Sequence, residues 1–187
     1  ALQQKQLKLI NLESSLDVRY GFPLQIFQQL IKEYTIEKVF TNHDYESYAT
    51  ERDEAIRKML NENGISLHTY KDQVIFEKNE VTKDDGKPYT VFTPYSRKWK
   101  QNLSECPVKI YKTEKYFNNF YKQAPKEIPS LPAMNFKPAG QSFPESVWQP
   151  DVIKKYKEQR DFPAIEGTSR LSVHLRFGTI SIRELAT

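Results

Sequence analysis

Residues 38–70 read KVFTNHDYESYATERDEAIRKMLNENGISLHTY, and their pattern alternates between two periods. Lys38–Asn42 is a short apolar run typical of a buried strand, and Ile65–Tyr70 is a second one. Between them, Thr50–Glu62 has helical spacing, and its buried side would carry Ile56, Met59 and Leu60. Thr50 and Asp53 resemble a capping pair, and Gly64 is suited to end the helix. The stretch therefore predicts one βαβ unit.

The same alternation is present upstream of this unit. Ser15–Tyr20 carries apolar side chains at period two, which predicts a strand over Leu16–Tyr20. Pro23–Tyr34 follows with helical spacing, and proline suits a first helical turn because its missing N–H has no partner there. Strand, helix, strand, helix, strand predicts an α/β fold with a doubly wound parallel sheet.

The composition is that of an aromatic-rich folded chain. Among the 187 residues, 11 Phe, 11 Tyr and 2 Trp can fill a core, which argues against general disorder. No run approaches the ~18 apolar residues of a membrane span. Cys106 is the single cysteine, so an intramolecular disulfide framework is excluded, and we expect a cytoplasmic protein. The formal net charge of +4 permits nucleic-acid binding without arguing for it.

The remainder of the chain divides by composition. Ala1–Leu12 is a polar helical pattern, and Ser96–Leu103 predicts a short helix. Six of the eleven prolines lie between Pro125 and Pro150, a composition typical of an ordered linker. We therefore expect an α/β domain over residues 1–105, a linker over 106–150, and the first helices of an all-α domain over 151–187. Those helices are predicted at Val152–Gln159, Arg170–Phe177 and from Ser181 onward.

The segment from Gly167 to Ser172 predicts an anion site. Gly167 permits a tight turn, and Thr168 or Ser169 is suited to cap a following helix. Free N–H groups at such a helix start, together with three hydroxyls, would bind a phosphate or pyrophosphate. Ser169 and Ser172, three residues apart, would share one face of the helix. The alternative is a capped helix that binds nothing, since Ser and Thr are ordinary caps.

Three stretches resemble the DNA photolyase/cryptochrome family. They are RDFPAIEGTSRLS (160–172) followed by HLRFGTIS (174–181), NHDYESYA (42–49) followed by ERD (51–53), and YTVFTPY (89–95) leading to Trp99. They stand in the family's order and at similar separations. The Gly-Thr-Ser-Arg-Leu-Ser form is most similar to the class I branch that repairs cyclobutane pyrimidine dimers.

The resemblance implies a Rossmann-like N-terminal α/β domain and a helical domain that binds FAD. The flavin's phosphates and ribityl chain would contact six residues: Tyr156, Thr168, Ser169, Arg170, Leu171 and Ser172. Arg160 stands where the family places a basic contact to the DNA backbone; its alternative role is a surface ion pair with Asp161 or Glu158. No catalytic residue is expected in this chain.

The resemblance also implies that the chain is a fragment, lacking the N-terminal strand region and most of the flavin domain. We expect such a fragment to be inactive on its own. A second, antenna chromophore is expected in this family. Folate binders carry an Asn-Glu pair where Tyr48 and Ala49 stand, which argues against folate and leaves a deazaflavin, a flavin or no antenna.

The implied activity of the intact protein is that of a deoxyribodipyrimidine photolyase, which splits pyrimidine dimers in DNA by light-driven electron transfer from reduced FAD. The alternative is a cryptochrome photoreceptor, which uses the same fold and cofactor for signalling. Damaged DNA is the expected partner, and no membrane partner is expected. No metal site is predicted, because His43, His68 and His174 are far apart in sequence.

Overall fold

The computed structural model describes residues 1–140, 142–147 and 149–186. Its helices and strands, in chain order, are α1 (Leu2–Ile10), α2 (Pro23–Glu33), β1 (Lys38–Asn42), α3 (Ser47–Glu62), β2 (Ser66–Tyr70), α4 (Phe92–Glu105), α5 (Pro150–Lys154), α6 (Tyr156–Gln159), α7 (Ser172–Arg176) and α8 (Ile182–Ala186). Short 3₁₀ turns lie at Lys78–Glu80, Glu114–Asn119 and Pro132–Met134.

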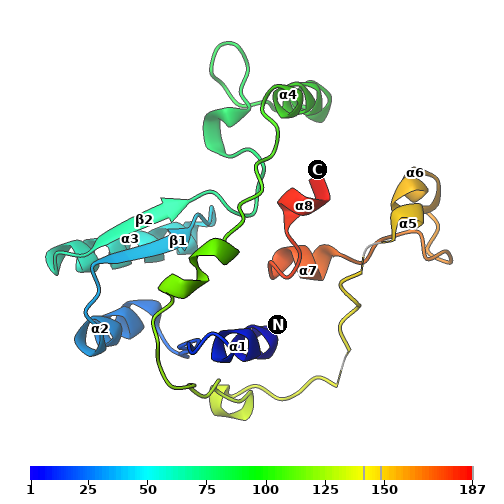
Figure 1. The fold of residues 1–187 in the computed structure, drawn as a ribbon. Coiled ribbons are helices and arrows are strands. Elements are labelled where there is room, and N and C mark those ends of the chain that lie inside the picture. Colours follow the sequence, from blue (N-terminus) through cyan, green and yellow to red (C-terminus); the bar gives the residue numbers. More distant parts are fainter. Residues whose placement is uncertain (141, 148, 187) are drawn as a thin grey trace. The chain divides into compact units, whose positions relative to one another are not determined.

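Strands β1 and β2 form the predicted parallel pair. Their register joins Lys38 to Ser66 and Asn42 to Tyr70, and α3 makes the crossover between them (Figure 1). The parallel βαβ unit predicted for residues 38–70 is therefore confirmed. A parallel pair needs a crossover of this length because its strands run in the same direction.

The core lies where α3 packs against the sheet. Its buried members are Ile56, Met59, Leu60, Ile65 and Leu67, with Phe27, Ile31, Ile36 and Val39 packed around them. Leu60 has no exposed surface. The three α3 residues predicted to be buried are all in this cluster, because they recur at the spacing that places side chains on one helical face.

The opposite face of β1 and β2 is open and aromatic. Phe40 is 63% exposed, and its ring stacks on His68 at 5.2 Å and on Tyr70 at 6.3 Å between centroids. Alternation along each strand produces this result, since Val39 and Leu67 point to the core while Phe40 and His68 point away.

The strand predicted at Leu16–Tyr20 does not form. This segment is in no strand, and a side chain rather than a neighbouring strand accepts its first backbone N–H. The Leu16 N–H donates to Gln6 Oε1 at 2.8 Å, and Gln6 is itself 93% buried, with only 7% of its surface exposed. Alternating apolar side chains occur wherever one side of a segment is covered, whether or not its backbone pairs with a strand. The pattern alone therefore did not distinguish a strand from a segment that is held by side chains.

Residues 122–126 are fastened along residues 12–17, and we call them the 122–126 strap. The amide of Gln6 donates to Ser15 Oγ and to the Lys126 carbonyl, both at 2.8 Å. The Lys126 N–H donates to Ser15 Oγ at 2.8 Å, and the Gln123 N–H donates to the Glu13 carbonyl at 3.1 Å. Except for the Gln6–Ser15 bond, the partners are more than 100 residues apart in the chain.

Several helices begin at residues other than those predicted. Helix α3 starts at Ser47, so Thr50 is not a cap; its hydroxyl donates to the Glu46 carbonyl at 3.0 Å inside the first turn. Helix α4 starts at Phe92 rather than Ser96. The single helix predicted over Val152–Gln159 is divided into α5 and α6 at Lys155.

The chain forms two compact units. The first contains Ala1–Asp72 and Lys112–Pro138, and the second contains Gln73–Tyr111 and Ala139–Thr187. In the second unit Phe76 packs edge-on against Trp99 of α4, with 5.6 Å between ring centroids. Within the described residues there is no helix long and apolar enough to span a membrane.

Candidate functional site

The predicted flavin-site residues lie on α6, on α7 and on the segment between these two helices. Tyr156 is the first residue of α6, and its ring is 46% exposed. The guanidinium of Arg160, at the end of the same helix, lies 5.6 Å from the centre of that ring. Arg160 also forms an exposed ion pair with Asp161 at 3.6 Å, one of the two alternatives that the sequence left open.

Gly167 joins α6 to the following segment by close packing. A Cβ at this position would lie 2.5 Å from Gln159 Cβ and 2.9 Å from the Gln159 carbonyl carbon and oxygen. Such contacts are shorter than packed carbon atoms allow. Gly167 is therefore required for the close approach of this position to Gln159 at the end of α6.

The predicted helix start at Arg170, with Thr168 or Ser169 as the cap, is wrong. Helix α7 begins at Ser172, its N-cap is Leu171, and no side chain caps it. Arg170 has a φ of +52°, a left-handed conformation that a continuing right-handed helix excludes. Ser169 lies outside α7, so Ser169 and Ser172 do not share a helical face.

The 168–172 segment nevertheless has unused hydrogen-bonding groups. Within the described part of the chain, the backbone N–H groups of residues 168–174 have no acceptor, and the hydroxyls of Thr168, Ser169 and Ser172 have no partner. Thr168 and Ser172 are exposed, whereas Leu171 is only 4% exposed and anchors the segment. The donors fit an anionic oxygen ligand such as a phosphate.

Arg170 is less available than the sequence implied. Its guanidinium forms an ion pair with Glu166 at 2.8 Å, and both side chains are exposed. An exposed pair of this kind is worth only about 0–1 kcal/mol, so an arriving phosphate can compete with the carboxylate for the guanidinium.

His174 is a positioning residue that the sequence did not assign. Its Nε2 lies 2.8 Å from the Pro144 carbonyl and therefore donates to it, while Nδ1 lies 2.8 Å from Thr179 Oγ1. The imidazole thus connects α7 to residue 144 of the proline-rich segment. A lone histidine in sequence gives no signal for such a contact, because its partners are a distant carbonyl and a threonine.

The carboxyl ends of β1 and β2 form a second ordered edge. His43 follows β1 directly. Its imidazole Nε2 lies 2.9 Å from Thr69 Oγ1, and its backbone N–H donates to the Tyr70 carbonyl at 2.7 Å. The Asp44 carboxylate accepts the Tyr45 N–H at 2.7 Å and so shapes the turn into α3. Nearby on α3, Tyr48 is 66% exposed and Ala49 is buried.

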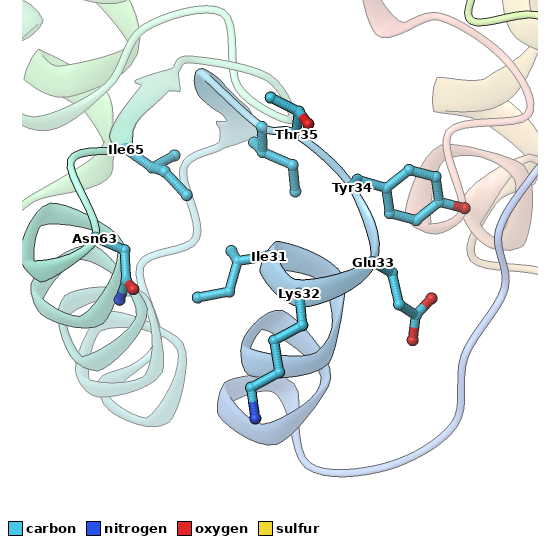
Figure 2. A pocket seen from close by; sticks show the side chains of 8 residues that line it. Ile31, Lys32, Glu33, Tyr34, Thr35, Asn63 and Ile65 are labelled. Atoms are coloured by element: carbon cyan, nitrogen blue, oxygen red, sulfur yellow. The ribbon is translucent and has the colours of Figure 1, made fainter.

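A pocket of about 490 Å³ lies at the opposite end of this sheet. Figure 2 shows it between the last turn of α2 and the α3–β2 connection, with Ile31 and Ile65 pointing into it and the Glu33 carboxylate pointing away. Ligands of α/β sheets bind outside the carboxyl ends of the strands, whereas this pocket is at their amino ends. The position of this pocket therefore does not favour a ligand site.

The sequence model of the DNA photolyase family matches residues 1–132 of the chain. The chain belongs to this family. A deoxyribodipyrimidine photo-lyase from Halobacterium salinarum is 30% identical over 184 residues, covering 92% of this chain. The chain spans 38% of the length of that relative and 41% of the length of a Synechococcus deoxyribodipyrimidine photo-lyase that is 28% identical.

Solved photolyase structures share the fold of this photolyase-family chain. A bacterial class III photolyase from Agrobacterium tumefaciens superposes with a TM-score of 0.72 at 23% identity, over 97% of this chain and 40% of the solved one. An archaeal photolyase from Sulfolobus tokodaii, solved with two FAD molecules, superposes with a TM-score of 0.62 at 22% identity, over 98% of this chain and 40% of that one. The expected α/β photolyase fold is thereby confirmed.

Proposed function

We propose that the chain is part of a deoxyribodipyrimidine photolyase, a carbon–carbon lyase that repairs cyclobutane pyrimidine dimers in DNA with light. The family match and the names of the curated relatives support this activity. The observation that carries the proposal is the 168–172 segment, whose free N–H groups and hydroxyls suit a dinucleotide's phosphates. The archaeal neighbour, whose structure holds FAD, supports FAD as that dinucleotide.

In this proposal the chain binds and orients the cofactor. Thr168, Ser169 and Ser172 donate to the phosphate and ribityl oxygens, and Arg170 exchanges Glu166 for a phosphate. Tyr156 supplies an exposed ring, and the anchored Leu171 fixes the 168–172 segment. Bound FAD in its reduced form supplies the electron that splits the dimer. The residue boundaries of the domains, at 105 and 150, stay predictions.

Arg160 is assigned to the DNA backbone. Its ion pair with Asp161 is long and exposed, so a phosphate can displace the carboxylate at little cost. The proposal includes a cytoplasmic location. It disfavours a folate antenna and leaves a deazaflavin, a flavin or no antenna open. For the antenna, the buried Ala49 and the exposed Tyr48 offer no acidic side chain at the positions where folate binders carry Asn-Glu.

The flavin assignment is tested by replacing two hydroxyls in the intact protein. Ser169→Ala with Ser172→Ala removes two donors to a charged ligand, each worth about 1.5–3 kcal/mol. We expect at least a tenfold rise in the dissociation constant for FAD, measured by fluorescence titration, and faster amide hydrogen exchange at residues 168–174 in the presence of FAD. Ser104→Ala in α4 is the matched control and should leave both unchanged. Unchanged FAD retention in the double variant would refute the assignment.

The activity itself is tested by illuminating the intact protein with DNA that contains pyrimidine dimers. Restoration of the monomeric pyrimidines under blue light is the expected result. Tight FAD binding without light-dependent repair would favour the photoreceptor alternative instead.

A further inference from the structure

Residues 112–122 form a basic, tyrosine-bearing surface that none of the flavin or DNA assignments above uses; we call it the Lys–Tyr strip. Three lysines and one glutamate give it a net charge of +2, half of the net charge of the whole chain. The two central phenylalanines are half-buried and all the other residues of the strip are exposed. Charge and exposed aromatic rings therefore coincide on one short segment.

Two of the three lysines of the strip are available to an anionic partner; the third, Lys122, pairs with Glu13 at 3.4 Å. Within the described residues, Lys112 and Lys115 form no ion pair. Lys115 Nζ lies 4.8 Å from the centre of the Tyr116 ring, which holds the charge beside an aromatic face. A ligand that offers both a phosphate and a planar base would satisfy the two groups together.

Three of the four rings of the strip contact other aromatic rings. Phe117 and Phe120 stack on one another at 5.1 Å, and the 3₁₀ turn Glu114–Asn119 presents Tyr116, which is 55% exposed. Tyr121 is 68% exposed, and its ring contacts Tyr34 of the first unit edge-on at 6.1 Å. The strip ends at Lys122, whose ammonium donates to the Leu12 carbonyl at 2.8 Å, so the 122–126 strap holds it in place.

We propose that the Lys–Tyr strip binds single-stranded nucleic acid, with phosphates on Lys112 and Lys115 and bases stacked on Tyr116 and Tyr121. Single strands suit it because their bases are free to stack on protein rings, whereas the bases of a duplex are already stacked on each other. An acidic peptide would use the lysines but leave the tyrosine faces unused. Because the segment is already ordered, little conformational entropy is lost on binding.

The test measures binding of a fluorescent single-stranded oligonucleotide of about 12 nucleotides to the full chain in the dark. The oligonucleotide has no adjacent pyrimidines, so it contains no dimer and its binding is independent of the proposed repair activity. We expect Tyr116→Ala and Tyr121→Ala each to weaken binding by about five- to a hundredfold, the usual effect of losing one stacked base. Tyr116→Phe, which keeps the ring, should restore binding.

The charge component is tested by a matched pair of double variants. Lys112→Gln with Lys115→Gln removes two charges from the strip, and Lys5→Gln with Lys58→Gln removes two from exposed positions on α1 and α3. Two phosphate contacts predict a slope of about −1.4 for log affinity against log salt. This slope should approach zero only in the first variant.

Three results would overturn the proposal. They are an equal loss of affinity in the α1/α3 control, unchanged affinity in both tyrosine-to-alanine variants, and binding of the corresponding duplex as tight as that of the single strand. Tyr20→Ala, at a tyrosine of similar exposure outside the strip, is the control for the ring variants. Far-UV circular dichroism of each variant verifies that it has folded.

Discussion

Asp17 lies at the centre of a charge cluster in the first unit. Its carboxylate accepts hydrogen bonds from Arg19, Tyr34 and Lys126, each at 2.8–2.9 Å, and Arg19 also pairs with Glu33. The Arg19 guanidinium, then Lys126 and Tyr34, lower the pKa of the Asp17 carboxyl, although partial burial opposes them. Arg19 likewise lowers the pKa of Glu33, while Asp17 raises the pKa of Lys126.

These shifts give a pH dependence with a definite sign. Because the folded-state pKa of Asp17 is below the unfolded value of about 3.9, its stabilisation is present above that pH and is lost as the pH falls further. We expect Asp17→Asn to lower the free energy of unfolding by about 1.5–3 kcal/mol at pH 7 and by much less near pH 2.

Urea titrations at both pH values measure the Asp17 effect. Asp85→Asn is the matched control. Asp85 is exposed, pairs with the Lys87 ammonium at 3.6 Å and accepts the Lys87 backbone N–H at 3.0 Å, so its replacement should change stability by less than about 1 kcal/mol. An equal effect of Asp17→Asn at the two pH values would contradict the role given to the charge cluster.

At the residue scale, the sequence predicted the types of group but not their neighbours. Tyr156 and Thr168–Ser172 were identified by resemblance, and whether they bind flavin stays a prediction. The close approach of Gly167 to Gln159 was missed, because Gly167 was interpreted as a turn residue and packing distances are absent from a sequence. Gln6 was missed for a similar reason, since a buried glutamine in a polar helix gives no periodic signal.

At the element scale, the junction between α6 and the 168–172 segment depends on Gly167. Gly167→Ala places a methyl group on the backbone of Gln159 and should cost about 1–3 kcal/mol as α6 is displaced. Gly64→Ala is the contrasting variant: its φ of +74° opposes a side chain, but nothing lies within 4 Å of the new Cβ.

The two alanine variants should differ in which residues show faster amide exchange. Amide hydrogen exchange should accelerate throughout residues 156–167 in Gly167→Ala, whereas in Gly64→Ala any acceleration should be confined to the end of α3. Unchanged amide exchange at residues 156–167 would show that Gln159 moves away from the new methyl group without loss of stability, and would contradict this prediction.

Elements with strong local periodicity were predicted well. Strands β1 and β2 and helices α2 and α3 were all expected close to their observed positions, since each combines a clear period with a capping or breaking residue. The strand at Leu16–Tyr20 and the helix start near Thr168 were wrong because both depended on partners outside the segment. Gln6 supplies the partner in the first case, and the left-handed Arg170 prevents the helix in the second.

At the scale of the whole molecule, buried apolar side chains are concentrated in the first unit. Ile56, Met59, Leu60, Ile65 and Leu67 cluster there, whereas Val81 and Leu171 are the buried apolar residues described in the second. Stability against local opening follows the burial of apolar contacts. We therefore expect the slowest amide exchange in α3 and β2, and much faster exchange throughout residues 150–186 in the absence of ligand.

Hydrogen exchange followed by mass spectrometry measures this contrast directly. If residues 150–186 were protected from exchange as strongly as α3, the core of the second unit would be as stable as that of the first. The α/β fold class was predictable, because the βαβ periodicity lies within one short stretch of sequence. The division into two compact units was not predictable, because each unit combines two separate stretches of the chain.

The 122–126 strap also sets an order of events during synthesis. Gln6, Ser15 and Asp17 emerge from the ribosome about 110 residues before Lys126, so at 5–20 residues per second they wait on the order of ten seconds for their partners. During that interval the side chains of Gln6, Ser15 and Asp17 lack the contacts that Lys126 later makes with them. A ribosome stalled just before residue 122 would thus hold the βαβ core with its N-terminal helix still unfastened.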